Sequence, residues 1–176
     1  VEDYLSRRGK TAPASGRLLA LDLATGKTVW EQREPVFGSF LAYSTEHDCL
    51  IQSLRPSRDT VAGEDGKRMR VVRGADGSPV WDRKVEYKTF PMIHNERIIT
   101  ESGALDLLTG NAVMRLDPVT GAETAWSWKR EYGCNYPVAS ENLLSFRSGA
   151  AGFYDLVSDS GTGHFGGFKS RSEEHT

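Results

Sequence analysis

The sequence predicts an all-β fold made of short strands and tight turns. Its 176 residues include 18 Gly and 7 Pro, which leaves few stretches long enough for a helix. A hairpin pattern recurs along the chain, in which a short apolar strand and a turn lead to a second strand ending in an aromatic residue. These endings, Trp30, Trp81, Trp126 and Phe165, are 51, 45 and 39 residues apart. Periods of about 40 to 50 residues are typical of four-stranded propeller blades, so we expect a partial β-propeller of about three and a half antiparallel blades.

The first expected element is half a blade over residues 17–33, preceded by a leader or linker over residues 1–16. Residues 17–21 are almost continuously apolar, as in a buried strand. The turn from Asp22 to Gly26 then leads into a second strand that ends at Trp30. This half blade therefore consists of one hairpin.

Three complete blades are expected at about 37–84, 89–130 and 134–169. In each, two short apolar strands joined by a polar turn precede the hairpin that ends in the aromatic residue. The strand pairs are 40–44 with 49–54, 91–93 with 97–101, and 137–140 with 143–147. The third hairpin, from Arg115 to Trp126, is preceded by an additional half-copy of the turn over residues 105–110.

The recurrent residues have structural roles in this prediction. Gly accepts a positive φ in the turn, Asp and Thr can hydrogen-bond the amides of the turn, and Trp buries a large surface between blades. The last copy is the weakest, with Gly161 as its expected turn residue. The predicted motif residues are Ala20, Asp22, Thr25, Gly26, Trp30, Gly77, Trp81, Asp106, Gly110, Asp117, Gly121, Trp126, Gly161 and Phe165.

The pattern Ala20-x-Asp22-x-x-Thr25-Gly26-Lys27-x-x-Trp30 resembles the tryptophan-docking motif of the pyrroloquinoline-quinone (PQQ) enzyme repeat. That repeat occurs in quinoprotein alcohol dehydrogenases and in non-catalytic relatives. The resemblance covers roughly residues 17–169, and residues 132–155 resemble the C-terminal propeller of large bacterial PQQ-like repeat proteins. Two copies depart from the motif, because Arg73 replaces the Asp and Met114 stands at a Trp position.

The resemblance implies that this chain is a piece of a longer propeller in a periplasmic or extracellular compartment. Its partners would be the remaining blades, and further proteins or components of the cell envelope. The last residues, 171–176, resemble the translation of a sequencing-library adapter, so we expect a non-native tail; a polar terminus is the alternative.

Two functions are compatible with the sequence. The first is a non-catalytic binding or scaffolding module without a cofactor, because every recurrent residue has a packing role; no catalytic, cofactor-binding or metal residue is assigned. The alternative, from the resemblance, is part of a quinoprotein dehydrogenase that holds PQQ and Ca²⁺. Its available oxygen ligands are Glu101, Glu141, Asn142 and Asp155.

Other functions are disfavoured by charge and spacing. The chain carries 22 basic and 24 acidic residues, a net charge of −2, which gives no electrostatic basis for binding nucleic acid. No apolar run is long enough for a membrane span. The four His and two Cys are scattered without metal-ligand spacing. Because Cys49 and Cys134 fall in separate blades, we predict that they are not bonded to each other. The resemblance implies that Cys134, rather than Cys49, would have lost a native partner; two independent core thiols are the alternative.

Overall fold

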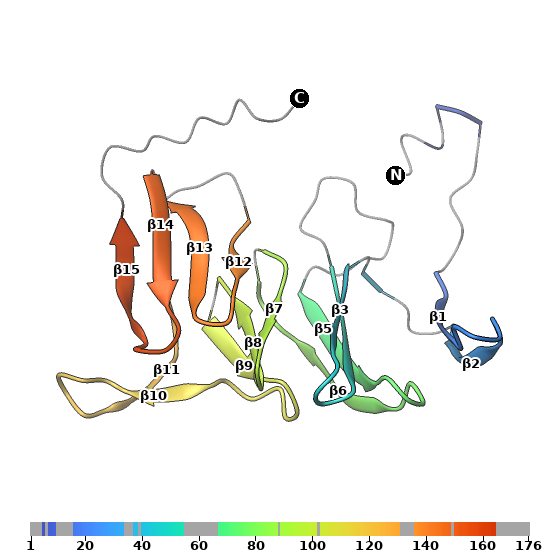
Figure 1. The fold of residues 1–176 in the computed structure, drawn as a ribbon, viewed down its shortest axis with the longest axis horizontal. Helices are drawn as coiled ribbons and strands as arrows, with labels where there is room; N and C mark the ends of the chain where they lie inside the picture. Colours follow the sequence, from blue (N-terminus) through green and yellow to red (C-terminus); the bar gives the residue numbers. More distant parts are fainter. Residues whose placement is uncertain are drawn as a thin grey trace. The chain divides into compact units, whose positions relative to one another are not determined.

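The computed structural model describes Leu5 and residues 7–9, 16–33, 37–38, 40–54, 67–87, 89–101, 103–130, 136–148 and 150–164. Every named element in these residues is a β-strand, and all pairings are antiparallel, in sheets of two to four strands (Figure 1). The all-β prediction is therefore confirmed. No helix in the described part of the chain is long and apolar enough to cross a membrane. The chain divides into two units, 1–90 with 107–110, and 91–106 with 111–176.

The first unit begins with a hairpin of β1 (Leu18–Leu21) and β2 (Thr28–Gln32). A bulge shifts the register between Ala20, which lies opposite Trp30, and Leu21, which lies opposite Thr28. The turn is closed by the Gly26 amide, which donates to the Asp22 carbonyl at 2.8 Å, with Gly26 at a φ of 67°. This is the hairpin expected for the half blade.

The four-stranded sheet of the first unit has the order β3 (Phe40–Ser44), β4 (Cys49–Ser53), β5 (Arg68–Arg73) and β6 (Pro79–Lys84). Its centre is apolar on both faces, because Ile51, Val71 and Val72 are all fully buried. The β5–β6 hairpin repeats the bulge of β1–β2 at the same place, with Trp81 opposite Val71. The two hairpins can therefore be superposed residue by residue along the repeat.

The second unit departs from the expected four-stranded blade over residues 89–130. It has a three-stranded sheet of β7 (Met92–His94), β8 (Arg97–Thr100) and β9 (Gly103–Asp106), and a separate hairpin of β10 (Met114–Leu116) and β11 (Glu123–Ala125). An isolated bridge pairs Leu105 of β9 with Ala112, which precedes β10. The cause is two successive turns, because the amides of Asp106 and Asp117 each close a hairpin of their own.

The last sheet has the order β12 (Val138–Ala139), β13 (Leu143–Ser148), β14 (Ala150–Asp155) and β15 (Ser160–His164). Leu144 and Phe146 alternate with exposed residues along β13, and their side chains join Trp126 and Trp128 in the core of the second unit. The last turn was expected at Gly161, but this residue lies within β15. The positive φ of the turn, 51°, belongs to Asp159, a residue type that tolerates this conformation.

Candidate functional site

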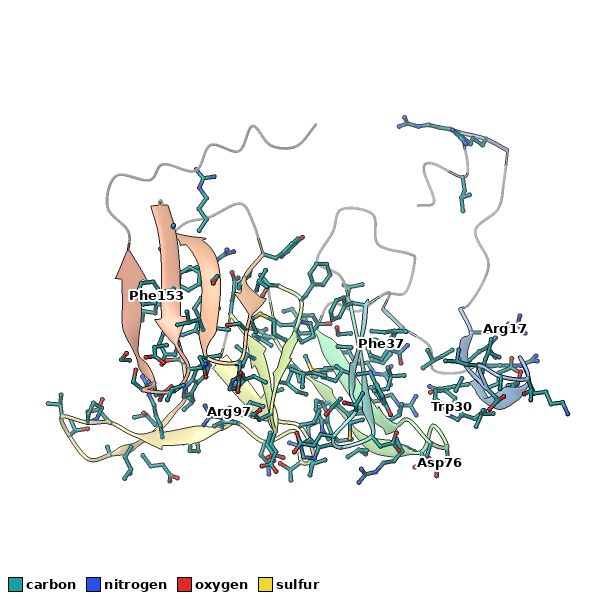
Figure 2. The ribbon with its side chains drawn as sticks, in the orientation of Figure 1. Arg17, Trp30, Phe37, Asp76, Arg97 and Phe153 are labelled. Carbon is teal, nitrogen blue, oxygen red and sulfur yellow. The ribbon has the colours of Figure 1, made fainter. Side chains whose placement is uncertain are left out.

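The indole of Trp30 docks on the next turn of the first unit. Its Nε1 donates to the Gly74 carbonyl at 2.7 Å, and a Cβ on Gly77 would lie 2.9 Å from the indole ring. Figure 2 shows the Trp30 side chain on the side of its hairpin that faces the turn carrying Asp76. Only glycine leaves room for this approach of the ring to the backbone.

Trp81 makes the same contact one repeat later. Its Nε1 donates to the Leu107 carbonyl at 2.8 Å, and a Cβ on Gly110 would lie 2.8 Å from the indole ring. Both Trp81 and Leu107 are buried, so this hydrogen bond is shielded from water. The turn that receives Trp81 lies in the half-copy over residues 105–110, and residues 107–110 belong to the first unit.

Trp126 docks within the second unit, but on a side chain. Its Nε1 donates to the carboxylate of Asp159, which also accepts a hydrogen bond from the Tyr154 hydroxyl at 2.9 Å. The guanidinium of Arg115 lies 3.3 Å from the same carboxylate. Asp159 stands four residues after Asp155, as Gly26 stands four after Asp22. It therefore occupies the position of the turn glycine.

Arg115, Tyr154 and Asp159 line a cavity of about 660 Å³ between the β10–β11 hairpin and the β14–β15 turn. Burial, followed by the hydrogen bond to Asp159, raises the pKa of Tyr154 to about 12, so the phenol stays neutral at pH 7. Arg115 and Asp159 neutralise each other beside it. The cluster joins three segments of the unit and contains no pair of a nucleophile and a free base. The remaining lining residues are Leu116, Pro118, Ser127, Trp128, Lys129, Ser158 and Ser160.

The aspartates of the turns act as local caps. Asp22 accepts hydrogen bonds from the Thr25 hydroxyl at 2.6 Å and the Thr25 amide at 2.7 Å, and these hydrogen bonds lower the pKa of Asp22. Asp117 binds Thr120 in the same way, and the hydroxyl and then the amide hydrogen bond of Ser158 lower the pKa of Asp155. These carboxylates are engaged by their own turns.

In the second copy, where Arg73 replaces the Asp, a residue from another turn takes over the capping. Asp48 accepts a hydrogen bond from the Ala75 amide at 3.0 Å and from the Tyr43 hydroxyl at 2.8 Å. Sequence reasoning missed Asp48 because it lies 25 residues before Arg73. Sequence reasoning also missed Asp159, for which the Asp-to-Asp step of four residues is the only signal.

Among the four oxygen ligands considered for calcium, the carboxylates of Glu101 and Asp155 are engaged by neighbouring residues. The Glu101 carboxylate lies 2.5 Å from the Arg130 guanidinium, and both side chains are largely buried. Asp155 caps its turn, while Glu141 accepts a hydrogen bond from His94 through its main-chain carbonyl. Within the described residues, no group of three His, Cys, Asp or Glu side chains is placed to hold a metal ion. We therefore derive no chemistry through PQQ and calcium here.

Cys49 is a buried free thiol at the start of β4. Its Sγ lies 3.4 Å from the His47 carbonyl, and burial raises the pKa of the thiol. Cys134 lies outside the described residues, as do Phe165 and the tail 171–176. The prediction about the pairing of the two cysteines remains a prediction.

Comparison with models of protein families gives no match, and no curated protein matches the chain. Among solved structures, the chain is similar to BamB from Moraxella catarrhalis, with a TM-score of 0.49 and 14% sequence identity. The alignment covers 83% of this chain and 45% of that chain. This chain thus spans less than half of the length of that solved structure.

Proposed function

We propose that the chain is a non-catalytic PQQ-like propeller module that acts in binding or scaffolding. One observation carries the proposal: the indole N–H of each of three repeated tryptophans donates a hydrogen bond to a turn of the following repeat. The recurrent residues therefore serve the docking of one repeat on the next. The proposed module has no cofactor.

The partners we propose are proteins, namely further blades of the same repeat and components of the cell envelope. The balanced charge of the chain supports protein partners over nucleic acid. The periplasmic or extracellular location and the bacterial origin rest on the sequence resemblance alone.

The alternative, part of a PQQ- and calcium-dependent dehydrogenase, is tested by equilibrium dialysis of the full chain against PQQ with Ca²⁺. A dye-linked assay of alcohol oxidation follows, with an active quinoprotein dehydrogenase as the positive control. We expect no retained PQQ and no dye reduction. Stoichiometric retention of PQQ together with substrate-dependent dye reduction would overturn the proposal.

A further inference from the structure

Polar residues occupy one junction of the second unit at three positions that are apolar or glycine in earlier copies of the repeat. These positions hold Arg115, Tyr154 and Asp159. Counted from the turn, the equivalent residues in the first two copies are Ala20 and Val71, Leu21 and Val72, and Gly26 and Gly77. The three polar side chains belong to two different hairpins, yet they meet at the Asp159 carboxylate. Packing alone does not explain why the repeat pattern changes at all three positions together.

The cavity that these residues line lies entirely within the second unit. Its walls come from the β10–β11 hairpin, residues 127–129 and the β14–β15 turn, all of which the structure describes. Figure 1 shows the β10–β11 hairpin running below the end of the last sheet at which β14 turns into β15. The volume of about 660 Å³ falls in the range of about 300 to 1,000 Å³ that is usual for small-molecule sites. The cavity is therefore large enough for an organic ligand of moderate size.

The guanidinium of Arg115 has more hydrogen-bond donors than its neighbours accept. Both hydrogen bonds that it makes to described residues come from Nη1, at 3.4 Å to the Tyr154 hydroxyl and 3.3 Å to the Asp159 carboxylate. Its Nε is buried without an acceptor among the described residues, and Nη2 makes no hydrogen bond to any of them. A guanidinium carries five N–H donors in a planar fork, and this side chain is 34% exposed where it lines the cavity. Arg115 can therefore donate from Nη2 to an acceptor that enters the cavity.

Three hydroxyl groups of the cavity already donate to other acceptors. The Tyr154 hydroxyl donates to Asp159 at 2.9 Å. The Ser158 hydroxyl donates to Asp155 at 2.7 Å, so Ser160 is the donor in its 2.7 Å contact with Ser158. An acceptor that enters the cavity therefore depends on the cationic lining residues for its main donors.

The walls of the cavity combine a net positive charge with apolar surface. The charged lining residues are Arg115, Lys129 and Asp159, which give a net charge of +1. Leu116, next to Arg115 in β10, is 70% exposed, and Pro118 in the same hairpin is exposed as well. Cationic donors beside exposed apolar side chains suit a ligand with one anionic group and an apolar body. An inorganic anion would leave the apolar wall uncovered.

We propose that this cavity binds a small monocarboxylate with an apolar side group, either a free acid or the carboxyl terminus of a peptide. The carboxylate accepts hydrogen bonds from Arg115 and pairs with Lys129, while the apolar side group covers Leu116 and Pro118. Asp159 positions the Arg115 guanidinium, which neutralises the charge of Asp159 in turn. The proposal goes beyond the scaffolding role, which rests on the indole hydrogen bonds, so the PQQ assay and a carboxylate-binding assay can fail separately.

The first probe is N-acetylphenylalanine, titrated into the full 176-residue chain at pH 7 and followed by isothermal titration calorimetry. We expect one site per chain with a dissociation constant below about 1 mM. N-acetylphenylalaninamide lacks the negative charge and acetate lacks the apolar group, so each should bind about tenfold more weakly or worse. A glycine-rich tetrapeptide that ends in phenylalanine with a free carboxyl group separates the two sources of ligand. Tighter binding of the peptide assigns the site to a peptide terminus, and weaker binding assigns it to a free acid.

Substitutions at the cationic residues locate the binding. Arg115→Gln removes the charge and should weaken binding about tenfold, whereas Arg115→Lys keeps the charge and should recover part of the affinity. The matched control is Arg17→Gln in the first unit, because Arg17 also pairs with a carboxylate, that of Glu31 at 3.4 Å; this variant should bind like the wild type. Lys129→Gln changes an exposed lining residue and should also weaken binding, which tests the site without disturbing Asp159.

Three results would overturn the proposal. The first is a dissociation constant above about 1 mM for both carboxylate probes. The second is equal affinity for N-acetylphenylalanine and either its amide or acetate, because the charge or the apolar wall would then contribute nothing. The third is binding that neither Arg115→Gln nor Lys129→Gln weakens, with folding of each variant verified by circular dichroism, because the ligand would then lie elsewhere.

Discussion

Replacing the turn glycines with alanine separates the cost of the backbone conformation from the cost of displacing a tryptophan. Gly26 and Gly110 have nearly the same φ, 67° and 68°. A Cβ on Gly26 would meet nothing within 4 Å, whereas a Cβ on Gly110 would lie 2.8 Å from the indole of Trp81. Both glycines belong to the first unit. The two alanine substitutions therefore cause the same backbone strain, and only the one at Gly110 also displaces a docked indole.

The magnitudes follow from these contacts. Alanine in the left-handed region costs about 1 kcal/mol, part of which is offset by the lower entropy of the unfolded chain. Gly26→Ala should therefore lower the free energy of unfolding by about 1 kcal/mol or less. In Gly110→Ala the indole must also move, which breaks its hydrogen bond to the buried Leu107 carbonyl and adds about 1 to 3 kcal/mol.

Urea denaturation followed by tryptophan fluorescence measures the difference. With a typical slope of about 1 to 3 kcal/mol per molar urea, an additional 2 kcal/mol shifts the midpoint by roughly 1 M. We expect the midpoint of Gly110→Ala to lie below that of Gly26→Ala by about this amount. Equal midpoints would refute the reasoning, because the docking of Trp81 would then contribute nothing measurable.

Three further predictions concern single side chains. Asp159→Ala removes the common acceptor of Trp126, Tyr154 and Arg115 and should cost about 2 kcal/mol in urea denaturation. If Asp117→Ala, in an exposed turn, costs as much, the Asp159 carboxylate has no special role. Because the pKa of Tyr154 is raised to about 12, its contribution to stability is present below pH 10 and is lost as pH rises through 12. Tyr154→Phe should remove that part of the alkaline loss, and an unchanged pH profile would contradict this. In a Cys134→Ser background, Cys49 should react with a thiol reagent slowly in the native chain and completely after unfolding, and fast native reaction would exclude a buried thiol.

Much of the fold could be predicted from the sequence because the repeat has a local signature. The step from Gly26 to Trp30 and from Gly77 to Trp81 indicated two hairpins, and both are present with the same bulge. The acceptors of the docked indoles could not be predicted. The Gly74 and Leu107 carbonyls belong to the main chain, which leaves no side-chain pattern to find.

The errors occurred where one local signal permits two structures. Both turns, Asp106 to Gly110 and Asp117 to Gly121, have the same spacing, so the sequence did not show that each closes a hairpin. The last turn was misplaced at Gly161 because glycine is the usual residue with positive φ, whereas Asp159 has that conformation. The cavity beside Asp159 depends on the approach of segments 40 residues apart, which spacing alone does not encode.

The type of acceptor also decides whether the hydrogen bond of a docked tryptophan depends on one particular side chain. A main-chain carbonyl is supplied by any amino acid, so the hydrogen bonds of Trp30 and Trp81 do not use the side chains at residues 74 and 107. Packing restricts these two residues instead, because a Cβ on Gly74 would collide with the Asp48 carboxylate and Leu107 is fully buried. The docking of Trp126 depends on a carboxylate at residue 159. The third junction therefore ties its tryptophan to one other side chain, and residues 126 and 159 are expected to change together.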